Sequence, residues 1–171
     1  RQQAEDWFRF AIENGHTAAN VALASILIGD ALGAAGRFPD PQTGAVDPRA
    51  IEAERLLQAA MEDGQPHARY FLYRLHAEGI GGYPVNLEQA AVHARAGAEG
   101  GLPALQSQYA QLLMDGLATD SDPLAAGRWA RQAALANDPL GIQLWRSFRE
   151  QASAEDLSRI EHRIPDRPGS D

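Results

Sequence analysis

Apolar residues recur three to four positions apart along most of the chain, in segments that each end at a glycine or an asparagine. This spacing places the apolar side chains on one face of a helix. Four such segments share one pattern and close at the anchor residues Gly15, Gly64, Gly101 and Asn137. Glycine and asparagine adopt the left-handed backbone conformation most easily, so we expect each anchor to end a helix.

The four segments also match one another when their anchors are aligned. The residues eight before the anchor are Trp7, Leu56, His93 and Trp129, and those eight after it are Leu23, Leu72, Tyr109 and Trp145. The residues two after the anchor are Thr17, Pro66, Pro103 and Pro139. Proline and threonine suit the start of a helix, so the pattern predicts pairs of helices joined by tight turns. In each pair, helix A ends at the anchor and helix B follows it.

A single helical hairpin cannot bury its apolar face, so neighbouring hairpins must stack. We therefore predict an all-α fold, an α/α solenoid of about four helix-turn-helix repeats with a short C-terminal capping helix. The solenoid is predicted to span residues 1–152, with repeats at about 1–30, 47–79, 86–116 and 122–150 and a loop insertion at 31–46.

The end of the chain has a different pattern. Residues 153–164 are predicted to form the capping helix, because Ser153 suits a helix start and Leu157, Ile160 and Ile164 share one apolar face. Residues 165–171 are polar and contain proline, which predicts a flexible tail.

The repeated order of alanine, aromatic, glycine and leucine positions between Ala4 and Trp145 resembles the Sel-one-like repeat, a relative of the tetratricopeptide repeat. Five residues depart from the family pattern, two of them being Asp30 and Ala152, which stand where the family has a glycine after the second helix of the repeat. His93 replaces an aromatic residue, and Leu105 and Gly141 stand where alanine is usual. The resemblance implies a protein-binding scaffold of bacterial signalling, envelope or secretion-linked proteins, and it implies no catalysis.

Composition narrows the possible partners. The chain has 171 residues, no cysteine and a formal net charge of −8, which argues against nucleic acid as a partner. No apolar stretch reaches the roughly 18 residues of a membrane span, so we expect no membrane insertion. The sequence begins with Arg1 rather than methionine, so we expect a fragment of a longer protein. Periplasmic, secreted and cytoplasmic locations all stay open.

The sequence contains few features that are typical of a catalytic or metal-binding site. Every basic residue is arginine, so the lysine of a phosphate-binding P-loop is missing, and no zinc-protease or serine-hydrolase motif is present. We therefore predict neither an enzyme nor a cofactor. His76 and His93 should meet where successive hairpins pack. Two histidines without nearby carboxylates make a poor metal or proton site, so we interpret them as half-buried rings.

Arginine recurs six residues before the anchor, at Arg9, Arg95 and Arg131, and Arg55 and Arg128 lie one turn away on their helices. Equivalent positions of a solenoid share one surface, so we expect these side chains on the concave helix-A surface, where guanidinium groups can bind carboxylates of a partner. The alternative is that glutamates of the same helices neutralise them. Arg131 has no acidic residue within reach on its helix, which makes it the first candidate for partner binding, followed by Arg128.

The 30–47 loop is the second candidate for partner binding, because it is longer than the other connectors and contains Arg37 and Phe38. Either it displays Phe38 to a partner, or Phe38 fills a gap between the first two hairpins. We expect a non-enzymatic scaffold or adaptor that binds a protein or peptide through the concave helix-A surface or this loop. The alternative is a specific regulator, inhibitor or immunity protein for a bacterial toxin or envelope sensor.

Overall fold

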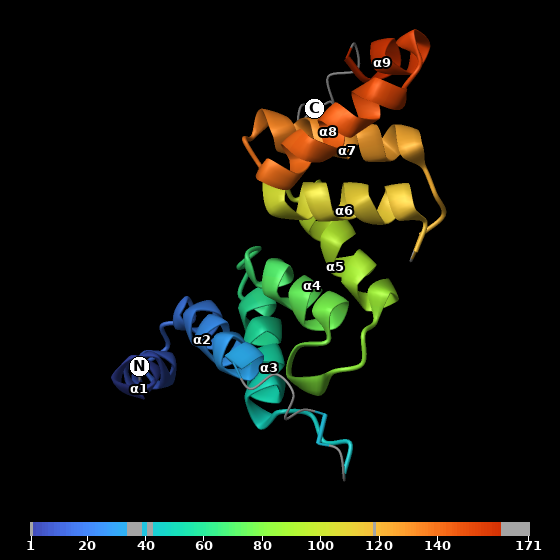
Figure 1. Cartoon of the computed structure of the whole chain (residues 1–171). Helices are drawn as coiled ribbons and strands as arrows, with labels where there is room; N and C mark the ends of the chain where they lie inside the picture. The colour runs from blue at the N-terminus through green and yellow to red at the C-terminus, as the bar shows by residue number, and fades with distance from the viewer. Residues whose placement is uncertain (1, 34–38, 41–42, 118, 162–171) are drawn as a thin grey trace. The chain divides into compact units, whose positions relative to one another are not determined.

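The protein is all-α, as expected: the computed structural model describes residues 2–33, 39–40, 43–117 and 119–161, and these contain helices and no strand (Figure 1). The helices are α1 (Gln2–Glu13), α2 (Ala19–Gly33), α3 (Pro48–Glu62), α4 (Ala68–Glu78), the 3-10 turn η1 (Ile80–Gly82), α5 (Leu87–Glu99), α6 (Pro103–Asp115), α7 (Pro123–Leu135), α8 (Pro139–Gln151) and α9 (Ala154–Glu161). None of these described helices combines the length and apolar character that crossing a membrane requires.

The anchors behave as the sequence predicts. Gly15, Gly64, Gly101 and Asn137 have φ angles of 82°, 75°, 80° and 61°, which lie in the left-handed region. Gly79 and Gly116 end α4 and α6 in the same conformation. In the first repeat Asp30 stands at the equivalent place, and α2 instead continues to Gly33, because aspartate meets a steric cost in that conformation that glycine avoids.

Capping residues set the other helix starts. The side chains of Asp47, Asn86, Asp122 and Asp138 accept backbone N–H groups at the starts of α3, α5, α7 and α8. Pro103 and Pro139 begin α6 and α8 as expected. By contrast, α2 and α4 begin two residues later than Thr17 and Pro66 indicate. A tighter turn precedes each of them, with carbonyl groups accepting from the N–H groups three residues on.

The chain divides into two compact units, residues 1–100 and 101–171. In the first unit α2 packs against α3 and α4 packs against α5. The core is made of leucine, isoleucine and alanine, with Leu23, Leu57, Leu72 and Leu75 almost fully buried. The last residues of the 30–47 loop join this core, since Val46 packs against it and the N–H of Asp47 donates to the carbonyl of Gly81 at 2.8 Å.

In the second unit α6, α7 and α8 pack on one another, and α9 packs against α7 (Figure 1). Two glycines let these helices approach closely. A Cβ atom on Gly127 would lie 2.7 Å from the Phe148 ring and 2.8 Å from Ile160, and one on Gly141 would lie 2.8 Å from the backbone nitrogen of Ala134. The close packing of α8 on α7 therefore explains why Gly141 replaces the usual alanine.

The capping helix forms within the predicted range. Ser153 Oγ accepts the backbone N–H of Asp156 at 3.1 Å and donates to the Asp156 carboxylate at 2.7 Å. Ile160 is buried, and Leu157 is half-buried. Ile164 and residues 165–171 lie outside the described residues.

Candidate functional site

A groove of about 650 Å³ lies between α7, α8 and α9 of the second unit. The C-terminal half of α7 contributes Arg131 and Leu135, which lie one turn apart on the same face. α8 contributes Trp145 and Arg146 together with their neighbours on the same face, and α9 contributes Leu157. Side chains from three helices therefore converge on one concave surface.

We call the large apolar side chains of the lining the apolar floor; they are Leu135, Ile142, Trp145 and Leu157, and none of them is fully buried. Leu135 is 69% exposed and Ile142 is 39% exposed. Trp145 is half-buried, and its ring stacks on Phe148 with centroids 5.8 Å apart and planes 14° apart. Exposed large apolar side chains that lie together in a concavity are typical of binding surfaces.

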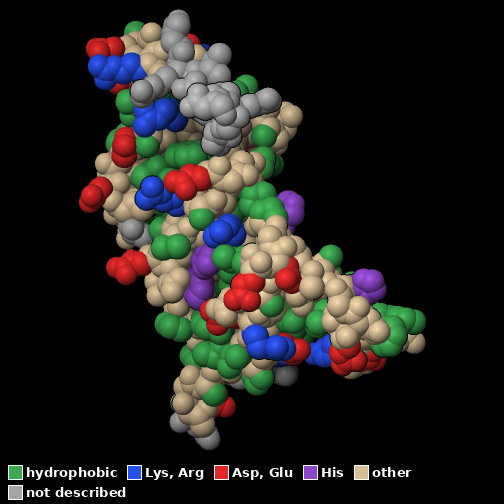
Figure 2. All heavy atoms as spheres, turned by 180° about the vertical axis from the view of Figure 1, so that it is seen from behind, with side chains coloured by type: hydrophobic (Ala, Val, Ile, Leu, Met, Phe, Trp, Pro, Cys, Tyr) green, Lys and Arg blue, Asp and Glu red, His purple; other side chains and the backbone are tan. Residues whose placement is uncertain are grey.

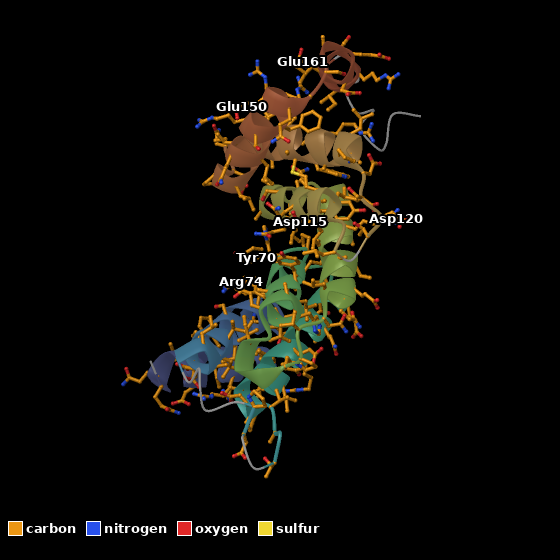
Figure 3. All side chains as sticks on the ribbon, turned by 45° about the vertical axis from the view of Figure 1, so that its right-hand side comes forward. Tyr70, Arg74, Asp115, Asp120, Glu150 and Glu161 are labelled. Atoms are coloured by element: carbon orange, nitrogen blue, oxygen red, sulfur yellow. The ribbon has the colours of Figure 1, made fainter. Side chains whose placement is uncertain are left out.

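Three guanidinium groups line the groove. Arg131 is half-buried, and Arg146 and Arg149 are exposed. None of the three forms an ion pair with another described residue. Glu150 is the acidic residue of the lining and lies on α8 (Figure 3). The groove is therefore a locally basic site in an acidic protein, suited to carboxylates beside apolar side chains.

The sequence contained a signal for this groove in the residues two before the anchors. The other repeats have glutamate there, at Glu13, Glu62 and Glu99, whereas the fourth has Leu135. An apolar residue in place of a solvated glutamate indicates that this surface has a role other than contact with solvent. Arg146 and Arg149 could not be assigned to the groove from sequence, because a polar last helix also suits a simple solvent-facing end of a solenoid.

The other predicted arginines lie in different surroundings. Arg9 Nη2 donates to Glu52 Oε2 at 3.1 Å, and Arg9 Nη1 lies 4.0 Å from Glu5. Arg95 Nε donates to Glu99 at 2.9 Å on its own helix, as the alternative interpretation predicts. On the face shown in Figure 2, basic and acidic side chains are interspersed.

The remaining candidates are less informative. Arg55 is exposed and Arg128 is half-buried, and neither forms an ion pair with a described residue or lines the groove. Arg37 and Phe38 lie outside the described residues.

A second polar cluster lies in the first unit, around the histidines that the sequence brings together. The rings of His76 and His93 stack with centroids 5.8 Å apart and planes 7° apart. The expectation that no carboxylate lies nearby was wrong: Glu54 Oε1 is 3.6 Å from His76 Nε2, and Glu54 Oε2 accepts the Tyr83 hydroxyl at 2.6 Å. Glu54 comes from α3, so only the packing of three elements reveals it.

The environment of this cluster disfavours a charge on His93. Burial lowers the pKa of His93 to about 4, helped by the nearby charges of His76 and Arg69 and opposed by Glu54. Its buried Nδ1 has no hydrogen-bond partner among the residues that the structure describes. Burial and the bond to Glu54 raise the pKa of Tyr83 above its usual value. Among the described residues, no group of three histidine, aspartate or glutamate side chains could hold a metal ion. We interpret the stacked rings and the Tyr83–Glu54 hydrogen bond as packing contacts between these elements.

Another cavity, of about 700 Å³, lies beside α6, α7 and α8. Its lining includes Asp122, Asp156 and Phe148, and no basic residue among those described. Asp122 caps α7 and Asp156 is bonded to Ser153. Both carboxylates therefore have structural roles.

Paired helices closed by left-handed anchors, with small residues buried between them, define an all-α helical-repeat solenoid. The fold is that of Sel1-like repeats. Comparison with protein-family models and with curated protein sequences finds no match. The solved structures with a similar fold include c5321, a protective antigen of uropathogenic Escherichia coli strains with an SLR fold (TM-score 0.75, 23% identity, 94% of this chain and 32% of that chain). Another is a Sel1 repeat protein from Oxalobacter formigenes (TM-score 0.58, 17% identity, 91% of this chain and 65% of that chain). The chain thus spans about a third of the length of the first protein.

Proposed function

We propose that the protein is a non-enzymatic interaction scaffold that binds a segment of another protein in the groove formed by α7, α8 and α9. The observation that carries the proposal is the combination of three arginines without ion pairs to described residues and an exposed apolar floor. Arginine and tryptophan are the side chains most often found at the energetic centres of protein interfaces. The groove unites both, with Arg131 on one side and Trp145 in its floor.

This proposal refines the two surfaces expected from sequence. Arg9 and Arg95 lie on equivalent helices, but their guanidinium groups already pair with glutamates. Before either arginine could pair with a carboxylate of a partner, its ion pair with glutamate would have to break. The free energy lost with that ion pair offsets much of the free energy gained from the new one. Arg131 carries no such cost, so the fourth repeat is the part of the helix-A surface best suited to a new carboxylate.

An unbiased peptide library displayed on phage tests the function. Peptides selected for binding to the wild-type chain should no longer bind Arg131→Glu or Leu135→Glu, since both side chains line the groove and neither is buried. Arg55→Glu, a charge reversal on the exposed face of α3, is the matched control and should bind normally. A library that yields no ligand sensitive to the groove variants would contradict the proposal.

The affinity for the natural partner then separates a scaffold from an inhibitor or immunity protein. We propose the scaffold, because the groove accommodates a few side chains rather than a whole domain surface. Isothermal titration calorimetry with a partner identified by its selected segment should give micromolar rather than subnanomolar affinity. A tight one-to-one complex that silences a toxin would support the inhibitor instead.

A further inference from the structure

In the first repeat, the surface that corresponds to the groove of the fourth repeat is covered by the helix that follows it. Leu23, Ala24 and Leu27 of α2 come eight, nine and twelve residues after their anchor and are at most 1% exposed, because α3 packs against α2. Arg9 on α1 comes six residues before the same anchor and donates to Glu52 of α3 at 3.1 Å. A single following helix therefore covers the face of α2 and neutralises the arginine of α1.

In the fourth repeat, different residues occupy these positions, and a different helix follows them. Trp145, Arg146 and Arg149 of α8 are the residues eight, nine and twelve after the anchor, and Arg131 is six before it. The following helix, α9, packs against α7 and contributes Leu157 to the groove. The groove therefore lies at the place where a following helix covers the first repeat.

We propose that the groove accepts an acidic amphipathic α-helix of a partner protein, an inference that rests on the proposed function and specifies its ligand. A carboxylate in the N-terminal half of that helix pairs with Arg131, as Glu52 pairs with Arg9. Apolar side chains spaced three and four residues apart cover Leu135 and Trp145. Further carboxylates on the flank of the helix face Arg146 in bidentate geometry.

Other occupants fit the observations less well. A second copy of this chain could offer α1, which exposes Trp7 and Phe10, but α1 has Gln3 at the position that corresponds to Glu52. The carboxylates of its N-terminal half are Glu5 and Asp6, of which Glu5 already lies 4.0 Å from Arg9, so α1 lacks a carboxylate at the position from which Glu52 reaches Arg9. A nucleic acid would pair its phosphates with the arginines, but it would leave the apolar floor uncovered and meet a chain of net charge −8.

The test uses fluorescein-labelled synthetic peptides of about four helical turns, with one glutamate in the N-terminal half, leucines on one face and glutamates on its flank. Three matched peptides replace the N-terminal-half glutamate by glutamine, the leucines by serine, or a central residue by proline. Fluorescence polarisation with the full chain should show binding of the parent peptide and at least about tenfold weaker binding of each altered peptide, because each loses charge pairing, burial or helix.

A double-mutant cycle locates the charge pair. Arg131→Gln should weaken the parent peptide by about tenfold or more, and it should cause no further loss with the peptide that carries glutamine. Arg55→Gln is the matched control and should change neither affinity. Equal binding of the glutamate and glutamine peptides, or losses that simply add, would overturn the assignment of the carboxylate to Arg131.

Three further outcomes would give the groove to a different occupant. Concentration-dependent self-association that the peptide displaces would assign it to a second copy, and tighter binding of a labelled single-stranded oligonucleotide would assign it to nucleic acid. A tenfold gain in peptide affinity on removal of residues 162–171 would assign it to the chain's own C-terminal segment. If the phage library yields groove-dependent ligands that are neutral or basic, the helix proposal fails while the proposed function stands.

Discussion

Replacing His93 with phenylalanine should make the stability of the first unit less sensitive to acid. The His93 pKa falls from 6.5 to about 4 on folding, mainly because the ring is buried. The unfolded chain therefore binds an extra proton between these two values. Stability is fully present above pH 6.5 and is lost as the pH falls from there toward 4.

The size of the effect follows from the same shift. Each pH unit below 6.5 costs about 1.4 kcal/mol, so acidification to about pH 5 costs about 2 kcal/mol for a fully buried ring. His93 is only half-buried, and water screens part of this cost, which leaves about 1 kcal/mol. The groups that face the ring are His76 and Arg69 of α4 and Glu54 of α3. His76 is in turn neighboured by Glu54, whose Oε1 lies 3.6 Å from His76 Nε2.

Urea unfolding followed by circular dichroism at about pH 8 and about pH 5 measures this quantity. Wild type should lose about 1 kcal/mol more than His93→Phe on acidification, because phenylalanine keeps the stacked ring but cannot bind a proton. His16→Gln, which removes an exposed histidine, is the control and should follow wild type. If His93→Phe lost as much stability as wild type between the two pH values, burial of a neutral His93 would not be the cause.

Three other predictions follow from the packing, the caps and the groove. Gly141→Ala should destabilise the second unit by about 1–3 kcal/mol in urea unfolding, since its Cβ meets the backbone of α7, whereas Gly33→Ala has open space and should be neutral or slightly stabilising. Asp47→Ala removes the cap of α3 and a buried carboxylate bonded to Arg49, so it should lower the melting temperature more than Asp122→Ala, which removes an exposed cap. Arg131→Glu should leave the melting temperature unchanged and abolish binding of library-selected ligands.

Much of the fold could be predicted because residues that meet the same structural requirement recur at the same position in several repeats. The anchors need a left-handed backbone, and glycine or asparagine stands at all of them. The stacking of His76 on His93 follows from the same register, since the two positions meet wherever helix A of one repeat packs on helix B of the preceding one. Glu54 was missed because it lies on α3, and the packing of α3 on α4 that brings it to 3.6 Å from His76 is not encoded by the spacing of residues along the sequence.

The groove was predicted only in part. The sequence predicts Arg131 as the first candidate because no acidic residue on its own helix can neutralise it, and Arg131 lines the groove in the structure. The contribution of α8 to the groove depends on how α9 packs. The packing of α9 could not be predicted, because a helix of eight residues has too few apolar positions to define it. The exposed Leu135 was the strongest overlooked signal, because it breaks a column that is otherwise glutamate.

We propose above all that the groove between α7, α8 and α9 is the binding surface of this protein. Hydrogen–deuterium exchange with and without the acidic helical peptide tests it most directly, because it reports every helix at once. We expect slower exchange confined to the C-terminal half of α7, to α8 and to the start of α9, and no such change in Arg131→Glu. Protection centred on α1 or α3, or protection that persists in Arg131→Glu, would contradict it.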